Sequence, residues 1–139
     1  MKKSPVIVLL LLPVVAVLAQ IPRSPSPQDA EVYIVSPKHG ATVSSPVRVV
    51  FGLRGMGVAP AGVNQPNTGH HHLLIDTEAP PLDRPIPADE HHKHFGGGQT
   101  ETTIELAKGE HTLQLVLADY IHVPHDPAVC SERIAITVR

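Results

Sequence analysis

The stretch that decides the fold is PVRVVFGLRG, residues 46–55. Large apolar side chains recur there at every second position, on one face of an extended chain: Val47, Val49, Phe51 and Leu53. Two arginines, Arg48 and Arg54, fall on the opposite face. An alternation of period two is typical of a β-strand with one buried face. The stretch therefore predicts a strand that contributes to a core.

Five further segments carry short apolar runs of the same kind. They are EVYIVS (31–36), HHLLID (71–76), TTIELA (102–107), HTLQLVLAD (111–119) and RIAITVR (133–139). Turn-forming residues separate the runs, and no segment after residue 19 sustains a helical period. The pattern predicts an all-β domain over residues 31–139, a single immunoglobulin-like antiparallel β-sandwich of about seven strands. A small barrel is the alternative.

The N-terminal residues form a separate region. Lys2 and Lys3 precede an apolar run over residues 6–19 that ends in the short side chains expected at a leader-peptidase site. We interpret residues 1–19 as a cleaved signal peptide, with an uncleaved membrane anchor as the alternative. Residues 20–30 are rich in Pro and Ser and are expected to be a linker. The protein is then periplasmic or secreted, with no membrane span after cleavage.

Composition limits the function. Loss of Lys2 and Lys3 leaves 9 basic against 13 acidic residues, and such a weakly acidic chain without a basic cluster is a poor candidate for nucleic-acid binding. Cys130 is the only cysteine, so an internal disulfide is excluded. It is a buried small hydrophobe, an intermolecular bridge or a soft metal ligand.

Histidine is the unusual feature of this sequence. Eight of the 10 histidines gather in three short clusters: His70, His71 and His72; His91, His92 and His94; His122 and His125. On a strand, His70 and His72 point to the same face about 6.6 Å apart, close enough to converge on one metal ion. His71 then points the other way with Leu73 and Ile75. Either face of this strand can be the buried one.

Imidazole is a good ligand for zinc, copper and nickel. The sequence predicts a metal site with ligands drawn from His70, His72, His94, His122 and His125, and copper or zinc as the ion. Supporting or alternative ligands are His71, His92, Asp76, Asp119 and Met56. The competing interpretations are that the histidines pack and hydrogen-bond within the loops, or that they are incidental surface residues.

The same segments resemble a family of exported bacterial proteins known as domain-of-unknown-function family 4399. The similar stretches are VSPKHGATVSSPVRVVFGLRGMGVAPAG, GHHHLLID, HFGGGQTET, GEHTLQLVLAD and HVPHDPAVCSERIAITV, which occur in family order over nearly all of residues 33–138. The resemblance implies an immunoglobulin-like periplasmic domain with His-rich loops, and it supplies no established activity. By resemblance, the positions that match the family's motifs are His70, His71, His72, His94, His122 and His125, with Asp76, Asp119 and Gln99 beside them.

Three functions compete at this stage. The first is a periplasmic metal-binding protein, with copper favoured over zinc, that buffers the ion or delivers it to a periplasmic or membrane partner protein. The second is a non-metal binding module that presents the loops 55–69 and 77–99 to a protein or small ligand. The third, a copper-dependent redox enzyme, is disfavoured because no catalytic motif accompanies the histidines. The oligomeric state is left open.

Overall fold

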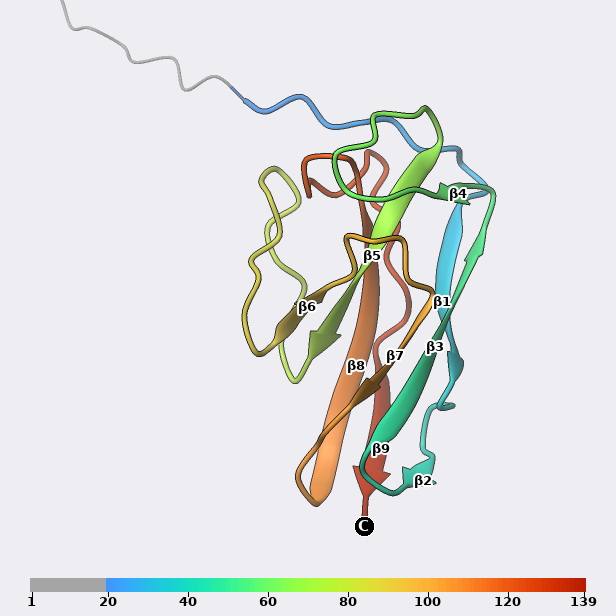
Figure 1. The fold of residues 1–139 in the computed structure, drawn as a ribbon, viewed down its shortest axis with the longest axis vertical. Helices are drawn as coiled ribbons and strands as arrows, with labels where there is room; N and C mark the ends of the chain where they lie inside the picture. The colour runs from blue at the N-terminus through green and yellow to red at the C-terminus, as the bar shows by residue number, and fades with distance from the viewer. Residues whose placement is uncertain (1–19) are drawn as a thin grey trace, which may run out of the picture.

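The computed structural model describes residues 20–139 of the 139-residue chain; the expected signal peptide at residues 1–19 lies outside this part. The described residues form nine β-strands in two facing sheets (Figure 1). No helix among these residues is long and apolar enough to cross a membrane. The predicted immunoglobulin-like β-sandwich is confirmed.

Six of the strands coincide with the six segments of alternating apolar residues. They are β1 (Glu31–Ser36), β3 (Val47–Arg54), β5 (Thr68–Ile75), β7 (Glu101–Ile104), β8 (Gly109–Ala118) and β9 (Ile134–Val138). Three short strands had no such signal: β2 (Thr42–Val43), β4 (Gly57–Val58) and β6 (His92–His94). The short strands form because longer neighbours offer them an edge, which a local sequence pattern does not reveal.

The two sheets differ in size. The smaller sheet has the order β1-β3-β7, and the larger has the order β2-β9-β8-β5-β4, with β6 also paired to β5. The long strands pair antiparallel, whereas β2 joins β9 and β4 joins β5 in parallel. The pair β5 and β8 shares six consecutive residue pairs, from His70 opposite Ala118 to Ile75 opposite Leu113. This pair forms the centre of the larger sheet.

The core lies between the sheets and is built from the residues that the alternation places inward. It includes Val32, Ile34, Val47, Val49, Phe51, Leu73, Ile75, Leu113, Leu115, Leu117, Ile136 and Val138. Full burial of such a side chain contributes about 1.5–3 kcal/mol. Aliphatic residues therefore supply most of the stabilisation in a chain with few aromatic residues.

Strand β5 is buried on both faces. Residues 69–75 are all buried, although only alternate side chains point into the space between the sheets. On the outer face Leu74 packs with Ile86, Val116 and Ala118, and Cys130 packs against this group. Ile86 belongs to the loop 77–91, so this loop covers part of the outer face. The histidines of β5 are consequently enclosed on whichever side they point.

Candidate metal centre

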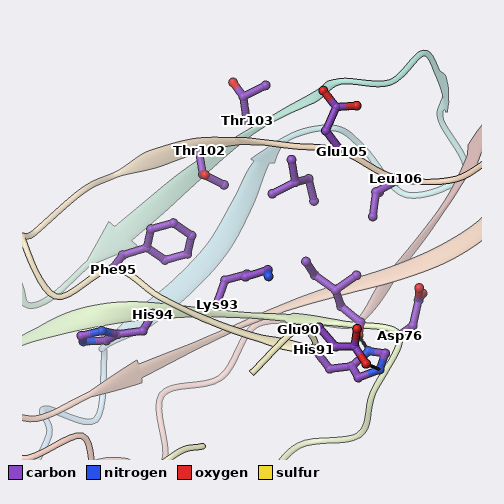
Figure 2. A pocket seen from close by; sticks show the side chains of 12 residues that line it. Asp76, Glu90, His91, Lys93, His94, Phe95, Thr102, Thr103, Glu105 and Leu106 are labelled. Atoms are coloured by element: carbon purple, nitrogen blue, oxygen red, sulfur yellow. Dashed lines mark hydrogen bonds and ion pairs between the residues drawn. The ribbon is translucent and has the colours of Figure 1, made fainter. Parts of the chain in front are cut away.

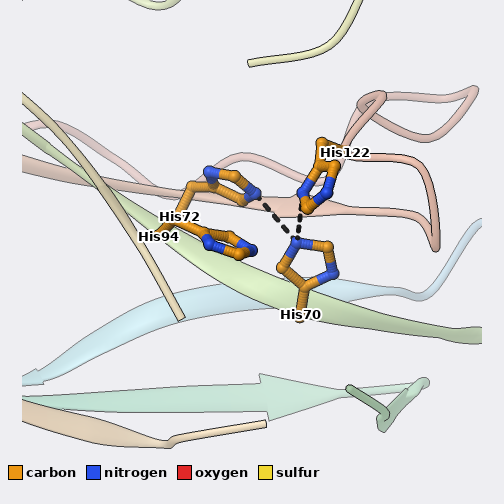
Figure 3. Close-up of side chains that lie close together, drawn as sticks. All are labelled: His70, His72, His94 and His122. Carbon is orange, nitrogen blue, oxygen red and sulfur yellow. Dashed lines mark hydrogen bonds between the residues drawn. The ribbon is translucent and has the colours of Figure 1, made fainter. Parts of the chain in front are cut away.

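Four histidines converge on the outer face of the larger sheet (Figure 3). His70 and His72 lie on β5, His94 lies on β6 directly opposite His72, and His122 lies in the loop after β8. Each offers one ring nitrogen, and these four atoms lie within 4.8 Å of one another. Segments far apart in the sequence thus bring four imidazoles to one point, and this group could hold a metal ion.

The spacing of the nitrogens is close to that of a coordination shell. His72 Nε2 lies 3.0 Å from His70 Nε2, which in turn lies 3.2 Å from His122 Nδ1. Nitrogen ligands about 2.0–2.1 Å from a tetrahedral zinc ion are separated by about 3.3 Å. The closest nitrogens are already at this distance, and a modest contraction of the group brings the remaining ring to it.

The two ligands on β5 are desolvated. His70 and His72 have 0% and 1% of their surface exposed, and the Nδ1 atom of each has no hydrogen-bond partner within the described residues. Burial, together with repulsion from neighbouring imidazoles, lowers the pKa of His70 to about 4 and that of His72 to about 2. Both rings are therefore neutral at pH 7, which is the form that binds metals.

His94 closes the group on the solvent side. The residue is exposed overall. The partial burial that remains, and after it repulsion from His122, lower the pKa of His94. The ring lies over Gly96, where a Cβ atom would be 2.3 Å from His94 Cε1. Gly96 also accepts a hydrogen bond from the Ala61 amide at 2.8 Å, which joins the loop after β4 to the loop after β6. A glycine is needed here because any side chain would displace the His94 ring.

His122 is placed by a tight turn around Asp119. The buried Asp119 carboxylate accepts hydrogen bonds from the Ile121 and Val123 amides, each at 3.0 Å. His122 has φ of 69°, a left-handed conformation that few non-glycine residues adopt. Asp119 was expected as a supporting or alternative ligand; in the structure its carboxylate bonds the backbone of the turn that carries His122.

His125 does not join the group, although it was expected to be a ligand. Its ring is buried elsewhere, with Nε2 donating to the Thr68 carbonyl at 3.1 Å and Nδ1 lying 3.4 Å from the Leu117 carbonyl. The turn at His122 sends its ring toward β5, whereas His125 packs beneath the loop against Gly69. His125 therefore has a structural role in holding the loop to the sheet.

The remaining histidines of the clusters also lie outside the group. His71 points into the core and packs on Phe51 at 5.1 Å between ring centroids, and neither ring nitrogen has a hydrogen-bond partner among residues 20–139. Burial lowers its pKa to about 4. His92 shares the outer face but pairs with Leu74, one step beyond His72, and its Nδ1 lies 2.8 Å from Asp89 Oδ1. Neither reaches the four nitrogens.

The other alternative ligands are engaged elsewhere. Asp76 accepts hydrogen bonds from the Thr112 amide and from His111, each at 2.7 Å. Met56 packs against the main core, and Cys130 packs in the outer apolar cluster, where burial raises the pKa of its thiol. Cys130 is a half-buried free thiol that packs against the outer apolar cluster. Within the described residues, the metal group contains nitrogen ligands only.

A cleft of about 610 Å³ lies on the other side of β6 (Figure 2). It is the open edge between the sheets, with β6 on one side and β7 on the other. Lys93, which alternates with His92 and His94, reaches into this cleft, and apolar residues such as Phe95 and Leu106 line it. Strand β6 therefore contributes both Lys93 and the metal-group residue His94 to the wall of this cleft.

The fold and the histidine group together define a class: a β-sandwich domain with a candidate metal centre on the outer face of its larger sheet. Residues 49–139, well over half of the chain, match the protein family described as Domain of unknown function (DUF4399). The chain belongs to this family, so the resemblance seen in the sequence is confirmed. Comparisons with curated proteins and with solved structures found no significant match.

Proposed function

We propose that this protein binds one divalent transition-metal ion in the periplasm, with copper favoured over zinc, and buffers or delivers it. One observation carries the proposal: four imidazoles from three parts of the chain place their ligand atoms within 4.8 Å of one another. The two buried members are kept neutral by their surroundings, and no carboxylate in the group competes for their nitrogens. Such a group is costly to bury unless it binds something.

The donor set favours copper(II) over zinc. Affinity for nitrogen ligands rises along the first-row series to Cu²⁺ and falls at Zn²⁺. Copper(I) prefers sulfur, and the two sulfur atoms considered as ligands, those of Met56 and Cys130, pack in apolar clusters instead. An all-imidazole site also needs no thiolate, which suits a compartment that oxidises free thiols.

The exposure of the ligands favours exchange of the ion. His70 and His72 are buried on the central strand β5, whereas His94 is exposed and His122 is half-buried. Structural zinc sites are closed on all sides. A site with two accessible ligands lets an incoming ligand displace His94 and then His122, while β5 still holds the ion. This arrangement supports buffering or delivery rather than a structural role.

The test is the metal content of protein made without a histidine tag and purified from periplasm. We expect one equivalent of copper in the wild type and less than a tenth of an equivalent in His70→Ala/His72→Ala. A matched control, His39→Ala/His111→Ala, removes two histidines outside the group and should keep the full equivalent. Equal metal content in both double variants, or no uptake by the wild type after loading with Cu²⁺, would refute the proposal.

The cleft between β6 and β7 favours a second function, a binding module for a protein or small ligand. Its wall includes residues of the 77–99 loop, which was expected to present a ligand-binding surface. The two functions are separated by chelation: we expect binding in this cleft to persist in EDTA, because three of the four histidines of the metal group, His70, His72 and His122, do not line it.

A further inference from the structure

The N-terminal segment Arg23–Ser26 lies against the loop that follows β8. The Asp126 amide donates to the Ser24 carbonyl at 2.9 Å, and the Ser26 amide donates to the Asp126 carbonyl at 3.2 Å. This segment falls within residues 20–30, where the sequence suggested only a linker. In Figure 1 it crosses the end of the sandwich at which the loop of His122 lies.

Two side chains strengthen this attachment. Arg23 Nε donates to the Pro124 carbonyl at 3.1 Å, and the guanidinium also donates to the His125 carbonyl and lies 3.4 Å from the Asp126 carboxylate. Ser24 Oγ donates to Asp119 Oδ2 at 2.7 Å. The segment therefore holds the loop at both its beginning and its end.

The contact between Ser24 and Asp119 reaches the metal group through one residue. Asp119 Oδ1 holds the Ile121 and Val123 amides, and its backbone brackets the same turn by bonds to His122 and Val123, each at 2.9 Å. Ser24 donates to the other oxygen, Oδ2, and so fixes the orientation of the Asp119 carboxylate. A left-handed residue such as His122 persists only where its surroundings determine its conformation.

We propose that Arg23–Ser26 is a strap that positions His122 and thereby sets how fast the proposed metal site releases its ion. With the strap docked, the site has four imidazoles. With the strap displaced, the turn at His122 loosens and the ion is held by His70, His72 and His94 alone. Ser24 and Arg23 are positioning residues, and the inference rests on the proposed function of the four-histidine group.

The test compares Arg23→Ala/Ser24→Ala with a matched control, Arg48→Ala/Ser45→Ala, which removes an ion pair and a serine hydrogen bond elsewhere. In metal-free protein, amide hydrogen exchange at Ile121 and Val123 should be at least about tenfold faster in the strap variant. With Cu²⁺ bound, release to EDTA should also be about tenfold faster, the scale of supporting-contact losses at metal sites. The electron paramagnetic resonance spectrum should show one fewer imidazole nitrogen.

Two milder variants guard against unfolding. Ser24→Ala alone should show the same changes in a smaller degree, and Ser24→Thr, which keeps a hydroxyl, should restore wild-type release. Unchanged exchange at Ile121 and Val123 would overturn the strap. Faster exchange with wild-type release and spectrum would also overturn it, because His122 would then be held independently. A wild type that takes up no Cu²⁺ would instead defeat the proposed function, which separates the two failures.

Discussion

The histidines of β5 and the pair formed by His111 and Asp76 show how environment divides one residue type into opposite roles. His70 and His72 are buried without an acidic partner, and their pKa values are lowered to about 4 and about 2. His111, on the neighbouring β8, has Nδ1 2.7 Å from Asp76 Oδ2 and Nε2 2.8 Å from the Ala107 carbonyl. The hydrogen bond to Asp76 raises its pKa.

The comparison separates histidines whose neutral form is favoured, which suits a cation, from a histidine whose protonated form is favoured, which suits an anion. A histidine bonded at both nitrogens to oxygen acceptors is stabilised as imidazolium. A histidine surrounded by other imidazoles is stabilised as the neutral ligand. Sequence spacing does not distinguish the two, because both kinds sit on strands of the same sheet. The following predictions probe this difference from its largest consequence to its smallest.

The largest expected effect is acid destabilisation of the metal-free protein. Unfolded histidine binds a proton below about pH 6.5, whereas folded His70 and His71 do so only near pH 4 and His72 near pH 2. Between these values the unfolded state holds more protons, so stability falls as pH falls. At pH 5 the loss is on the order of 2 kcal/mol for each of these three histidines.

Urea unfolding in EDTA at pH 7, 6 and 5 measures this loss. Replacing His70 and His72 by Gln should make the dependence on pH distinctly shallower, because two of the histidines with lowered pKa values are gone. Replacing His111 by Gln should leave the acid loss in place. An unchanged slope in the His70→Gln/His72→Gln variant would show that these rings are not desolvated in solution.

The next effect is stabilisation by the metal ion. A free ion concentration one hundred times the dissociation constant adds about 2.7 kcal/mol. For a domain of this size, that corresponds to a rise in Tm of roughly 10 °C. Differential scanning calorimetry with Cu²⁺ and with Zn²⁺ should show the rise in the wild type and in His111→Ala. It should be absent from His70→Ala/His72→Ala, and a rise that persists there would place the ion elsewhere.

The sandwich could be predicted from sequence because alternation is local. Val47, Val49 and Phe51 on β3, and Leu113, Leu115 and Leu117 on β8, each alternate with residues that face outward, and all six are core residues. The outer face of β5 could not be predicted in the same way. Both faces of β5 are buried, so either choice of inward face would place apolar residues in the core. The outer face is covered by Ile86, which comes from a loop outside β5.

The candidate site was predicted in composition but not in detail. His70, His72 and His94 followed from the two-residue spacing on extended segments, and the pairing of His72 with His94 brings them together. His122 and His125 were indistinguishable, since only the turn around Asp119 decides which ring faces β5. The contacts of Arg23 and Ser24 could not be predicted from the sequence, because nothing in a Pro/Ser-rich segment indicates which distant residue a serine will bond.

The inner face of β5 offers a smaller test of the same contrast. His71 is buried against Phe51, and in the described part of the chain neither of its ring nitrogens has a hydrogen-bond partner, so it bears the cost of a desolvated polar group without a ligand's role. Replacing it by Leu should stabilise the metal-free protein at pH 7 by about 1–2 kcal/mol, the cost of an unsatisfied buried polar group. Metal stoichiometry should stay at the wild-type value. A variant destabilised in urea unfolding would mean that His71 has a polar partner.

The smallest expected effect comes from His111 and has the opposite sign to the acid loss. Because its folded pKa is raised, its contribution is fully present below about pH 6.5 and disappears as pH rises through the raised value. The site is partly exposed, so the contribution is under about 1 kcal/mol. Urea unfolding of His111→Gln should therefore show a deficit against the wild type at pH 6 that shrinks by pH 8.5. Asp76→Asn should reproduce this deficit, because either change removes the charged pair. A deficit in His111→Gln that stays constant across this range would mean that the neutral imidazole holds Asp76 equally well, and that the contrast with His70 and His72 arises from burial alone.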